Sequence, residues 1–485
     1  MSVMTIRVNI TSGREAFHQK FGALDKTDIS IAMAFTFVAA IILIPGLGVQ
    51  SLANWDEAIY GVVTRELLKH PGLTLRYGDR LWFEKPPFAF WLMSASSFVF
   101  GLTEFALRLP SALFGITAIA LQYLAGRRVG DRTAGLLAAL LLLGVPQFVA
   151  YSRLAMMDVP VTTLGMLSVV LLLYGETRPA FMISAGAIFG LAILTKSVAA
   201  FLFVPGLLSI AIAKHGVRFL HSKEIGLAIF AALAVALPWH VWSTLTYGRL
   251  YLDQYFGFHI VGRFVRPLEG HEGSSFYYLE TYFHNAGIFA PVHLAGISLA
   301  VGLAIVKRDR LLSAASILPL AVFTMVTLQA TKIGAYLTAV CPGAALAAAL
   351  GIMGVVQNTV ARVVVLLVAL LLALPGIGIG RGSFVETSDI LVFSPEVRSL
   401  RNTPLFVNRV PLLYVFDVAD PAPRFYLADR VEIIDEQGLE RLVANRQTFL
   451  CLTFKAQAGE FLNNHPDTNL KIVATTDYLA VMAYR

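Results

Sequence analysis

Long apolar runs alternate with short polar connections through most of this chain. A membrane-spanning helix needs roughly 17–25 mainly apolar residues. The pattern therefore predicts an α-helical polytopic membrane protein with about eleven spans. The runs lie near residues 30–49, 107–126, 133–151, 157–174, 180–196, 198–213, 225–245, 286–306, 312–330, 334–356 and 359–379.

A shorter apolar stretch, 87–102, is rich in serine and aromatic residues and needs a separate argument. The connections 127–132, 213–223 and 307–310 are compact and basic, and such loops stay on the cytoplasmic side. Counting back from the first of them, the run 107–126 must enter the membrane from outside. The stretch 87–102 is therefore predicted to lie on the outer surface without crossing, with the N-terminus of the chain cytoplasmic and the C-terminus outside.

The chain changes character near residue 380, where apolar segments become short and polar residues return. Alternating strand and helix patterns are typical of a small α/β domain. We therefore divide the chain into a transmembrane domain, 1–379, and an extracytoplasmic α/β domain, 380–485. The predicted strands are VPLLYVFDV, RVEIID, TFLCLTF and NLKIVATT, and the predicted helices are EQGLERLVAN and AGEFLNNH.

Composition agrees with this organisation. Hydrophobic residues make up 57% of the 485 positions and charged residues only 14%, against about 25% charged in soluble domains. The polar N-terminal stretch lacks the features of a cleaved secretory signal, so the first span is expected to remain as an anchor. The net charge of +7 reflects membrane orientation and does not indicate nucleic-acid binding. Cys341 and Cys451 lie in unrelated contexts, so we expect no disulfide framework.

Each predicted outer connection carries ionisable residues, which are costly near a membrane and indicate function. Each also has an ordinary structural explanation: a lysine at a helix end can snorkel to the interface, and an aspartate at a helix start can interact with the helix dipole. The acidic pair next to the rigid EKPP sequence is the least easily explained in that way. The candidate residues are Asp56, Glu57, Glu84, Lys85, Arg153, Asp158, Lys196, His259, Arg263, His271, Lys332 and Tyr336.

Transfer from a lipid-phosphate donor would use this set of residues. The phosphate needs cations, for which Lys85, Arg263 and Lys332 are candidates, together with Arg153 or Lys196. The acceptor needs a carboxylate to take its proton or orient it. Asp56 and Glu57 are equivalent candidates on this reasoning alone. A carboxylate and an imidazole, Glu84 and His271, can also hold a divalent metal ion, the one cofactor that the pattern suggests.

The ordered set FEKPPFAFW, RLPSALFG, SRLAMMDVP, HIVGRF and TKIGAYL, after the acidic pair, resembles the GT-C glycosyltransferases that use polyprenyl-phosphate sugars. The chain is most similar to the lipid A aminoarabinose transferase branch, and more distantly to the protein O-mannosyltransferases. The resemblance implies surface helices in the first outer loop and an inverting transfer outside the membrane.

The resemblance also implies roles for individual residues. It makes Asp56 the catalytic carboxylate with Glu57 beside it, and Asp158 the second acidic residue of the site. Lys85 would contact the donor phosphate. The remaining matches are Lys332 and Tyr336, which lie in the region that lines the family's cavity, and Glu84 and His271, at positions that bind metal in the aminoarabinose branch.

The sequence departs from the aminoarabinose pattern at Ile59, Phe258 and Ser274, so the sugar and the acceptor stay open. We expect a multi-pass protein of the cell inner membrane whose partners are membrane lipids, a polyprenyl-phosphate-linked sugar and a lipid A, glycan or protein acceptor. The main alternative is a transporter or flippase of lipid-linked sugars, but its charges would gather near the bilayer midplane on repeated halves. A structural or sensory protein that acts through 380–485 would leave the acidic pair and Lys85 unexplained.

Overall fold

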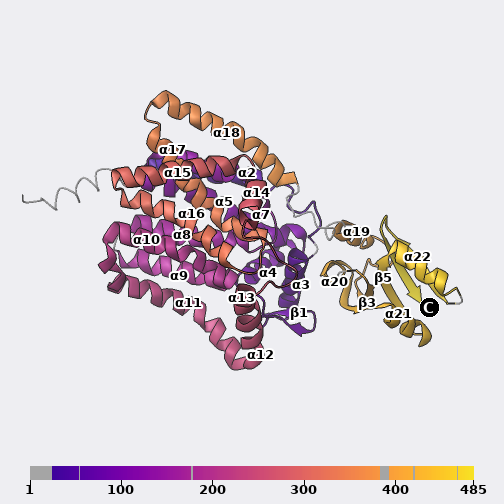
Figure 1. Ribbon diagram of the computed structural model, residues 1–485. Helices are drawn as coiled ribbons and strands as arrows, with labels where there is room; N and C mark the ends of the chain where they lie inside the picture. The colour runs from indigo at the N-terminus through magenta and orange to yellow at the C-terminus, as the bar shows by residue number, and fades with distance from the viewer. Residues whose placement is uncertain are drawn as a thin grey trace, which may run out of the picture.

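A computed structural model describes residues 24–53, 55–175, 178–382, 393–418, 421–466 and 468–484. It shows a large bundle of long helices joined to a small domain that contains a sheet (Figure 1). The bundle helices are α2 (Lys26–Leu43), α5 (Glu104–Val129), α6 (Arg132–Leu143), α7 (Pro146–Ser152), α8 (Asp158–Gly175), α9 (Pro179–Lys196), α10 (Val204–His215), α11 (Lys223–Tyr247), α15 (Phe289–Lys307), α16 (Arg310–Leu328), α17 (Val340–Val355) and α18 (Thr359–Gly382).

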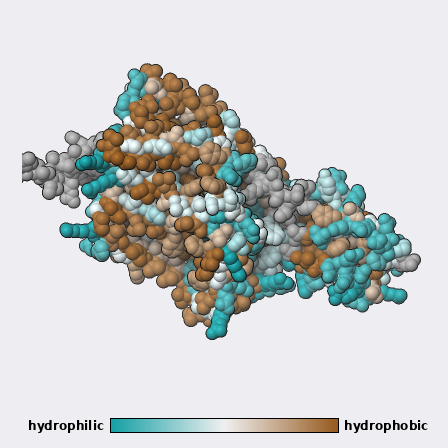
Figure 2. All heavy atoms as spheres, viewed as in Figure 1, coloured by the Kyte–Doolittle hydropathy of each residue, from teal (hydrophilic) through white to brown (hydrophobic). Residues whose placement is uncertain are grey.

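On the face shown in Figure 2, the surface of the bundle is largely apolar, whereas that of the small domain is mostly hydrophilic. Within the described residues, nine helices are long and apolar enough to cross a membrane, or ten when α6 and α7, which meet at 71°, count as one span. A multi-pass membrane protein, as the sequence predicts, is therefore confirmed. The first residues of the chain, 1–23, lie outside the described part.

The segment Pro179–His215 explains most of the difference from the predicted eleven spans. It counts as one apolar segment of 37 residues, which as a straight helix would be about 55 Å long against a hydrocarbon core of about 30 Å. However, α9 ends at Lys196. The next residue, Ser197, has a φ of 48° and begins a 3₁₀ segment, η1 (Ser197–Phe203), which leads into α10. At the far end of α10, Lys214 Nζ donates to the carbonyls of Leu172 and Leu173, 2.8 Å away, near the end of α8. Helices α9 and α10 therefore run in opposite directions, which supports two passes, and the exact number of crossings stays a prediction.

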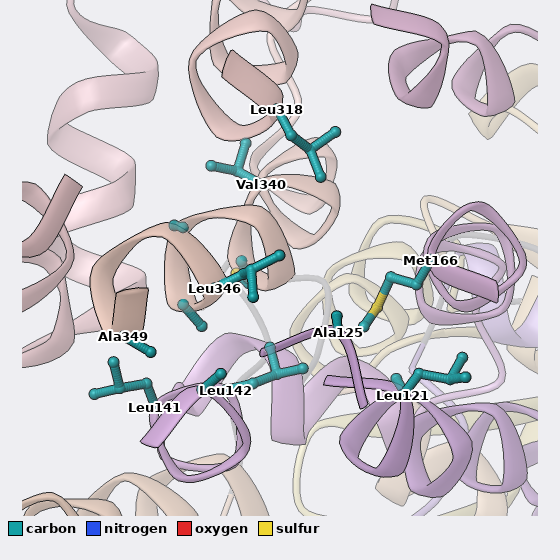
Figure 3. Close-up of a cluster of buried hydrophobic side chains, with 14 of the residues drawn as sticks. Leu121, Ala125, Leu141, Leu142, Met166, Leu318, Val340, Leu346 and Ala349 are labelled. Carbon is teal, nitrogen blue, oxygen red and sulfur yellow. The ribbon is translucent and has the colours of Figure 1, made fainter. Parts of the chain in front are cut away.

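The bundle core is built from small and branched side chains of helices distant in sequence (Figure 3). Leu121 of α5, Leu142 of α6, Met166 of α8 and Leu346 of α17 are at most 6% exposed. Gly296 of α15 lies so close to α17 that an added Cβ would come 2.5 Å from the Cα of Ala348. Small residues of this kind let membrane helices approach one another closely.

The first outer loop carries its own helices. Helix α3 (Asp56–Lys69) is followed by the short hairpin of β1 (Arg76–Tyr77) and β2 (Arg80–Leu81) and then by α4 (Phe88–Phe100). The 13 residues of α4 are too few to cross a bilayer, and α4 packs against α3 and α5 while Phe98 is 86% exposed. This arrangement agrees with the surface position predicted for 87–102.

The second long outer connection, between α11 and α15, is largely helical. It contains α12 (Arg249–Tyr251), a π-helix η3 (Leu252–Gly262), α13 (Arg263–Val265) and α14 (Tyr277–Ala286). A further 3₁₀ segment, η2 (Val217–His221), precedes α11, and another, η4 (Gly334–Ala339), leads into α17.

The small domain is a five-stranded mixed sheet with the strand order β4-β3-β5-β7-β6. Strands β3, β4 and β5 are parallel, whereas β7 runs antiparallel to both β5 and β6. The predicted strands and helices of this α/β domain are present, and the structure adds β7, α19 and α20. Because α18 continues to Gly382, the helix passes the predicted boundary at 380. The elements are α19 (Phe393–Leu400), β3 (Val410–Phe416), α20 (Pro421–Tyr426), β4 (Ala428–Ile434), α21 (Glu436–Ala444), β5 (Phe449–Phe454), α22 (Lys455–Asn464), β6 (Leu470–Thr475) and β7 (Leu479–Tyr484).

The small domain packs on the first outer loop, so the two lie at the same end of the bundle (Figure 1). Because the basic connections lie at the opposite ends of their helices, we predict that the C-terminus is outside the cytoplasm. A reporter that is active only in the cytoplasm should be silent when fused after Arg485 and active when inserted at 307–310. An active C-terminal fusion would mean that the predicted orientation is wrong.

Candidate functional site

The predicted acidic pair lies where the chain leaves the first span and enters α3. Helix α3 begins at Asp56, so both carboxylates lie in its first turn, where the helix dipole favours negative charge. Successive residues of an α-helix point about 100° apart. The structure separates the two accordingly: Asp56 is half-buried, and Glu57 is 1% exposed.

Glu57 is held in a buried ion pair. Arg108 Nε and Nη2 donate to the two carboxylate oxygens of Glu57 at 2.8 and 2.7 Å. The backbone N–H groups of Ala53 and Ala155 donate to the same carboxylate at 2.8 and 2.6 Å. With four donors, this carboxylate joins α3, α5 and the connection after α7. We therefore interpret Glu57, a predicted catalytic residue, as a positioning residue of the site.

Arg108 also holds the backbone that precedes α3. Its guanidinium donates to the carbonyls of Leu47, Gln50 and Ser51, each at 2.8 Å. The arginine of the RLPSALFG motif thus fixes the loop that leads to Asp56. A fork of five donors is suited to this task, since it can serve a carboxylate and several carbonyls at once.

Asp56 faces a charged environment. Burial raises the pKa of Asp56, and the positive charges of Lys85 and Lys196 oppose that rise. Burial also raises the pKa of Glu84 and lowers that of Lys85, while the opposite charges of these neighbours act against both shifts. A carboxylate beside a partly desolvated lysine is a common feature of catalytic sites.

Asp158, at the start of α8, pairs with Lys196 at the end of α9. Lys196 Nζ lies 2.6 Å from Asp158 Oδ1 and 5.5 Å from the centre of the Tyr336 ring. The second carboxylate oxygen of Asp158 is buried and has no hydrogen-bond partner among the described residues. The pair is therefore held in place with one oxygen still available to accept a hydrogen bond.

A cavity of about 320 Å³ brings residues from distant parts of the sequence together. Most of the charged side chains around it are cations, and the rest of the lining is mainly apolar, as a site for a lipid-linked anion requires. Its walls come from the first outer loop, the start of η1, the second half of the π-helix, α13 and η4. The polar lining residues are Glu84, Lys85, Lys196, Ser197, His259, Arg263, Gln329 and Tyr336.

The π-helix and α13 supply His259 and Arg263. Burial, with the nearby charges of Lys85 and Arg263, lowers the pKa of His259 to about 3, so its ring is neutral at physiological pH. Arg263 Nη2 pairs with Glu269 at 2.7 Å, while its Nε is buried and without a partner among the described residues. His259 Nδ1 is also buried and has no hydrogen-bond partner among the described residues. Arg263 Nε can therefore donate a hydrogen bond to a ligand in the cavity, and His259 Nδ1 can donate or accept one according to its tautomer.

Two predicted phosphate-binding cations do not line this cavity. Arg153 donates to the carbonyls of Ile42, Leu43 and Pro45 at the end of α2. Lys332 Nζ donates to the carbonyls of Thr327 and Gln329 at the end of α16. Cations stabilise the C-terminal ends of helices, and this role accounts for both residues.

The predicted metal pair is also not assembled as a binding cluster. Glu84 lines the cavity, whereas His271 is not part of its wall; the His271 carbonyl accepts a hydrogen bond from the backbone of Lys332. Among the described residues, no group of three or more histidine, cysteine, aspartate or glutamate side chains is arranged to hold a metal ion. The described residues thus give no support to a protein-bound metal centre, and a metal ion held by Glu84 and His271 stays a prediction.

Lys196 and His259 are candidate residues from the sequence, but the family resemblance gives neither of them a role, although both stand in unusual contexts. Lys196 interrupts the apolar stretch LTKSVAAF, and His259 begins the HIVGRF motif four residues before Arg263. The residues that the structure does bring to the cavity are Glu84, Lys85, Arg263 and Tyr336, with Asp56 and Asp158 next to them through charge interactions.

Comparison with known proteins gives consistent results. The family model for dolichyl-phosphate-mannose-protein mannosyltransferases matches residues 84–242. The undecaprenyl phosphate-alpha-4-amino-4-deoxy-L-arabinose arabinosyl transferase of Yersinia pestis (strain Pestoides F) is 26% identical over 263 residues, which are 52% of this chain and 47% of that protein. The enzyme of the same name from Wigglesworthia glossinidia brevipalpis is 33% identical over 111 residues, 23% of this chain and 19% of its own. The chain thus spans less than half of the length of either relative.

Solved structures extend the likeness to almost the entire fold. The crystal structure of ArnT from Cupriavidus metallidurans bound to undecaprenyl phosphate superposes with a TM-score of 0.71 at 20% identity, covering 94% of this chain and 98% of that one. At this identity the likeness concerns the fold. The chain therefore has the fold of ArnT, and over part of its sequence it resembles the aminoarabinose transferases and, more distantly, the protein O-mannosyltransferases.

Proposed function

We propose that this protein is a membrane glycosyltransferase that moves a sugar from a polyprenyl-phosphate carrier to an acceptor of the cell envelope. The observation that carries this proposal is the cavity in which Lys85, Lys196 and Arg263 gather beside Asp56. Cations can hold a lipid phosphate, and a carboxylate can act on the acceptor. The named activity of the Yersinia relative and the ligand in the Cupriavidus structure support the same chemistry.

In the proposed reaction, an acceptor hydroxyl or phosphate attacks the anomeric carbon of the sugar. A bond forms between that carbon and the acceptor oxygen, and the bond to the carrier phosphate breaks. Asp56 takes the acceptor proton where the acceptor is a hydroxyl, and the carrier leaves as polyprenyl phosphate. Attack opposite the leaving group inverts the anomeric centre.

The cations act on the leaving group. As the sugar departs, negative charge grows on the phosphate, and Lys85 and Arg263 are placed to stabilise it. The Asp158 carboxylate keeps Lys196 at the cavity wall, and Tyr336 lies beside the same ammonium group. A second, apolar groove of about 420 Å³ between α4 and α5 offers room for lipid chains at the membrane surface.

The acceptor is the finer part of the proposal. We favour lipid A because of the resemblance to the aminoarabinose branch, whereas the family-model match equally supports transfer to a protein. The cell inner membrane is the expected location, with the cavity on the extracytoplasmic side. A flippase remains the alternative function, and it predicts movement of the donor without release of free carrier.

Loss of the Lys85 charge should weaken use of the donor. Lys85→Ala removes a charge-assisted contact of about 1.5–3 kcal/mol, so we expect the efficiency of transfer to fall by roughly ten- to a hundredfold. The variant should stay folded in detergent. The measurement is the transfer rate of purified protein at varied donor concentration, with Lys223→Ala as a control because that lysine is exposed at the start of α11. Wild-type rates in Lys85→Ala would contradict the proposed phosphate contact.

The pH profile should report on Asp56. A general base must be deprotonated, so the rate should fall as the pH drops through the pKa of Asp56, which burial raises above the ordinary value of about 4. Lys85 lowers that pKa, so its removal should raise it further. We therefore expect the acidic limb to move to higher pH in Lys85→Ala and to stay in place in Lys223→Ala. An unchanged limb in Lys85→Ala would contradict the coupling.

A further inference from the structure

The loop that presents Asp56 is held partly by the C-terminal domain. This loop, residues 47–53, connects the first span to α3, and its contacts come from two directions. Arg108 of α5 binds it from the bundle. From the other side, two residues of the C-terminal domain bind other backbone groups of the same loop.

Tyr426, at the end of α20, is one of these residues. The backbone N–H of Leu52 donates to the Tyr426 hydroxyl at 2.8 Å, and that hydroxyl donates to Glu104 at 3.0 Å. All three groups are buried. The adjacent peptide group, the N–H of Ala53, donates to Glu57, so the contact lies one residue from the buried ion pair.

Arg398 of α19 is the second residue of the C-terminal domain that binds loop 47–53. It pairs with Glu104 at 3.0 Å and donates to the carbonyls of Val49 at 2.7 Å and Gly48 at 3.3 Å. The Glu104 carboxylate thus accepts a hydrogen bond from Tyr426 and forms an ion pair with Arg398. The C-terminal domain supplies two side chains to a loop more than 340 residues away in sequence.

Packing between α20 and α3 supports the same arrangement (Figure 1). Phe425 lies against Gly61 so closely that a Cβ at Gly61 would come 2.8 Å from the ring. The buried side chains of both parts form one hydrophobic cluster that includes Leu52, Tyr60, Val415 and Phe425. The first outer loop and the C-terminal domain therefore share a core.

The backbone at this place is strained. Trp55, directly before Asp56, has a φ of 104°, which is unfavourable for a residue with a side chain. Such conformations persist when surrounding contacts impose them, and they are frequent at functional sites. Arg108, Tyr426 and Arg398 are among the side chains that hold the preceding loop in place.

We propose that the C-terminal domain contributes residues that the transfer site needs. Tyr426 and Arg398 are positioning residues, which hold loop 47–53 so that Asp56 faces the acceptor. The inference rests on the proposed function for its kinetic consequence. Its structural consequence, an ordered loop, can be measured without any substrate.

The test compares Tyr426→Phe and Arg398→Lys with Tyr414→Phe in the full-length protein. Tyr414 serves as the control because it lies on β3 and packs on Phe449, in a separate cluster of the same domain. In the first two variants, we expect amide hydrogen exchange of a peptide covering 47–57 to be faster. We expect kcat to fall roughly tenfold, as expected for a lost buried hydrogen bond, with an unchanged KM for undecaprenyl-phosphate sugar. Tyr414→Phe should match the wild type in both measurements.

Unchanged exchange in Tyr426→Phe and Arg398→Lys would overturn the proposal, and so would faster exchange with an unchanged kcat. A rise in KM at constant kcat would also overturn it, because that pattern indicates donor binding rather than placement of Asp56. Gly61→Val, which should separate α3 from α20, provides an independent variant with the same expected results. A wild-type protein that transfers no sugar would overturn the proposed function instead, and the exchange measurement would still decide whether the domain orders the loop.

Discussion

Asp56→Asn is expected to lower turnover at least a hundredfold. The substitution keeps the shape of the side chain and its hydrogen-bonding capacity but removes the negative charge and the basicity. Loss of a general base typically costs 10²–10⁴-fold. Because the donor phosphate is held by cations rather than by Asp56, donor binding should be largely kept. The measurement is turnover of a radiolabelled polyprenyl-phosphate sugar by purified protein, with donor affinity determined separately.

Asp79→Asn is the matched control for this experiment. Asp79 lies in the same outer loop, in the exposed turn between β1 and β2, so the same chemical change there should leave turnover near that of the wild type. Equal turnover in Asp56→Asn and the wild type would contradict the mechanism. A greater loss of turnover in a folded Glu57→Gln protein would give the catalytic role to Glu57.

Breaking the Glu57–Arg108 pair should have the largest effect on stability. Removal of one partner leaves a buried charge without compensation, which typically costs about 3–5 kcal/mol. We expect Glu57→Leu and Arg108→Leu each to lower the resistance of the protein to thermal unfolding in detergent, measured from intrinsic fluorescence. Arg108→Leu should be at least as damaging, because it also frees the carbonyls of Leu47, Gln50 and Ser51.

The double variant, Glu57→Leu with Arg108→Leu, provides the internal test of this explanation. It contains no unpaired charge, so it should be more stable than the sum of the two single losses predicts. Arg430→Ala removes one partner of an exposed pair with Glu432 and should change stability by less than about 1 kcal/mol. Single variants as stable as Arg430→Ala would contradict a structural role for the buried pair.

Much of the fold could be predicted because it depends on local patterns. Apolar run length gives the spanning helices, and charge asymmetry between loops indicates that 87–102 stays at the surface. Alternation of apolar and polar residues along the chain indicates the strands that have one exposed face. Strand β7 was not predicted, because all six of its residues are buried and it therefore shows no alternation. The π-helix lies in a segment, 246–285, for which the sequence predicts only a long outer loop.

The candidate site could be predicted only in part, because its geometry depends on contacts between distant residues. Sequence places Asp56 and Glu57 side by side, but the difference between them comes from Arg108, 51 residues beyond Glu57. Arg153 and Lys332 resemble phosphate ligands in sequence, since a cation that binds a helix terminus has the same local context as one that binds a ligand. The position of Lys196 at the cavity depends on its ion pair with Asp158, which lies on another helix.

The most direct test of the central claim is mass spectrometry of lipid A and other envelope glycans, and of membrane proteins, from cells that make the wild-type protein, Asp56→Asn or neither. We expect an added sugar on one of these acceptors with the wild type, its absence with Asp56→Asn, and release of undecaprenyl phosphate only where the sugar appears. Identical acceptors in all three kinds of cell, despite a supply of polyprenyl-phosphate sugar, would contradict the assignment as a glycosyltransferase.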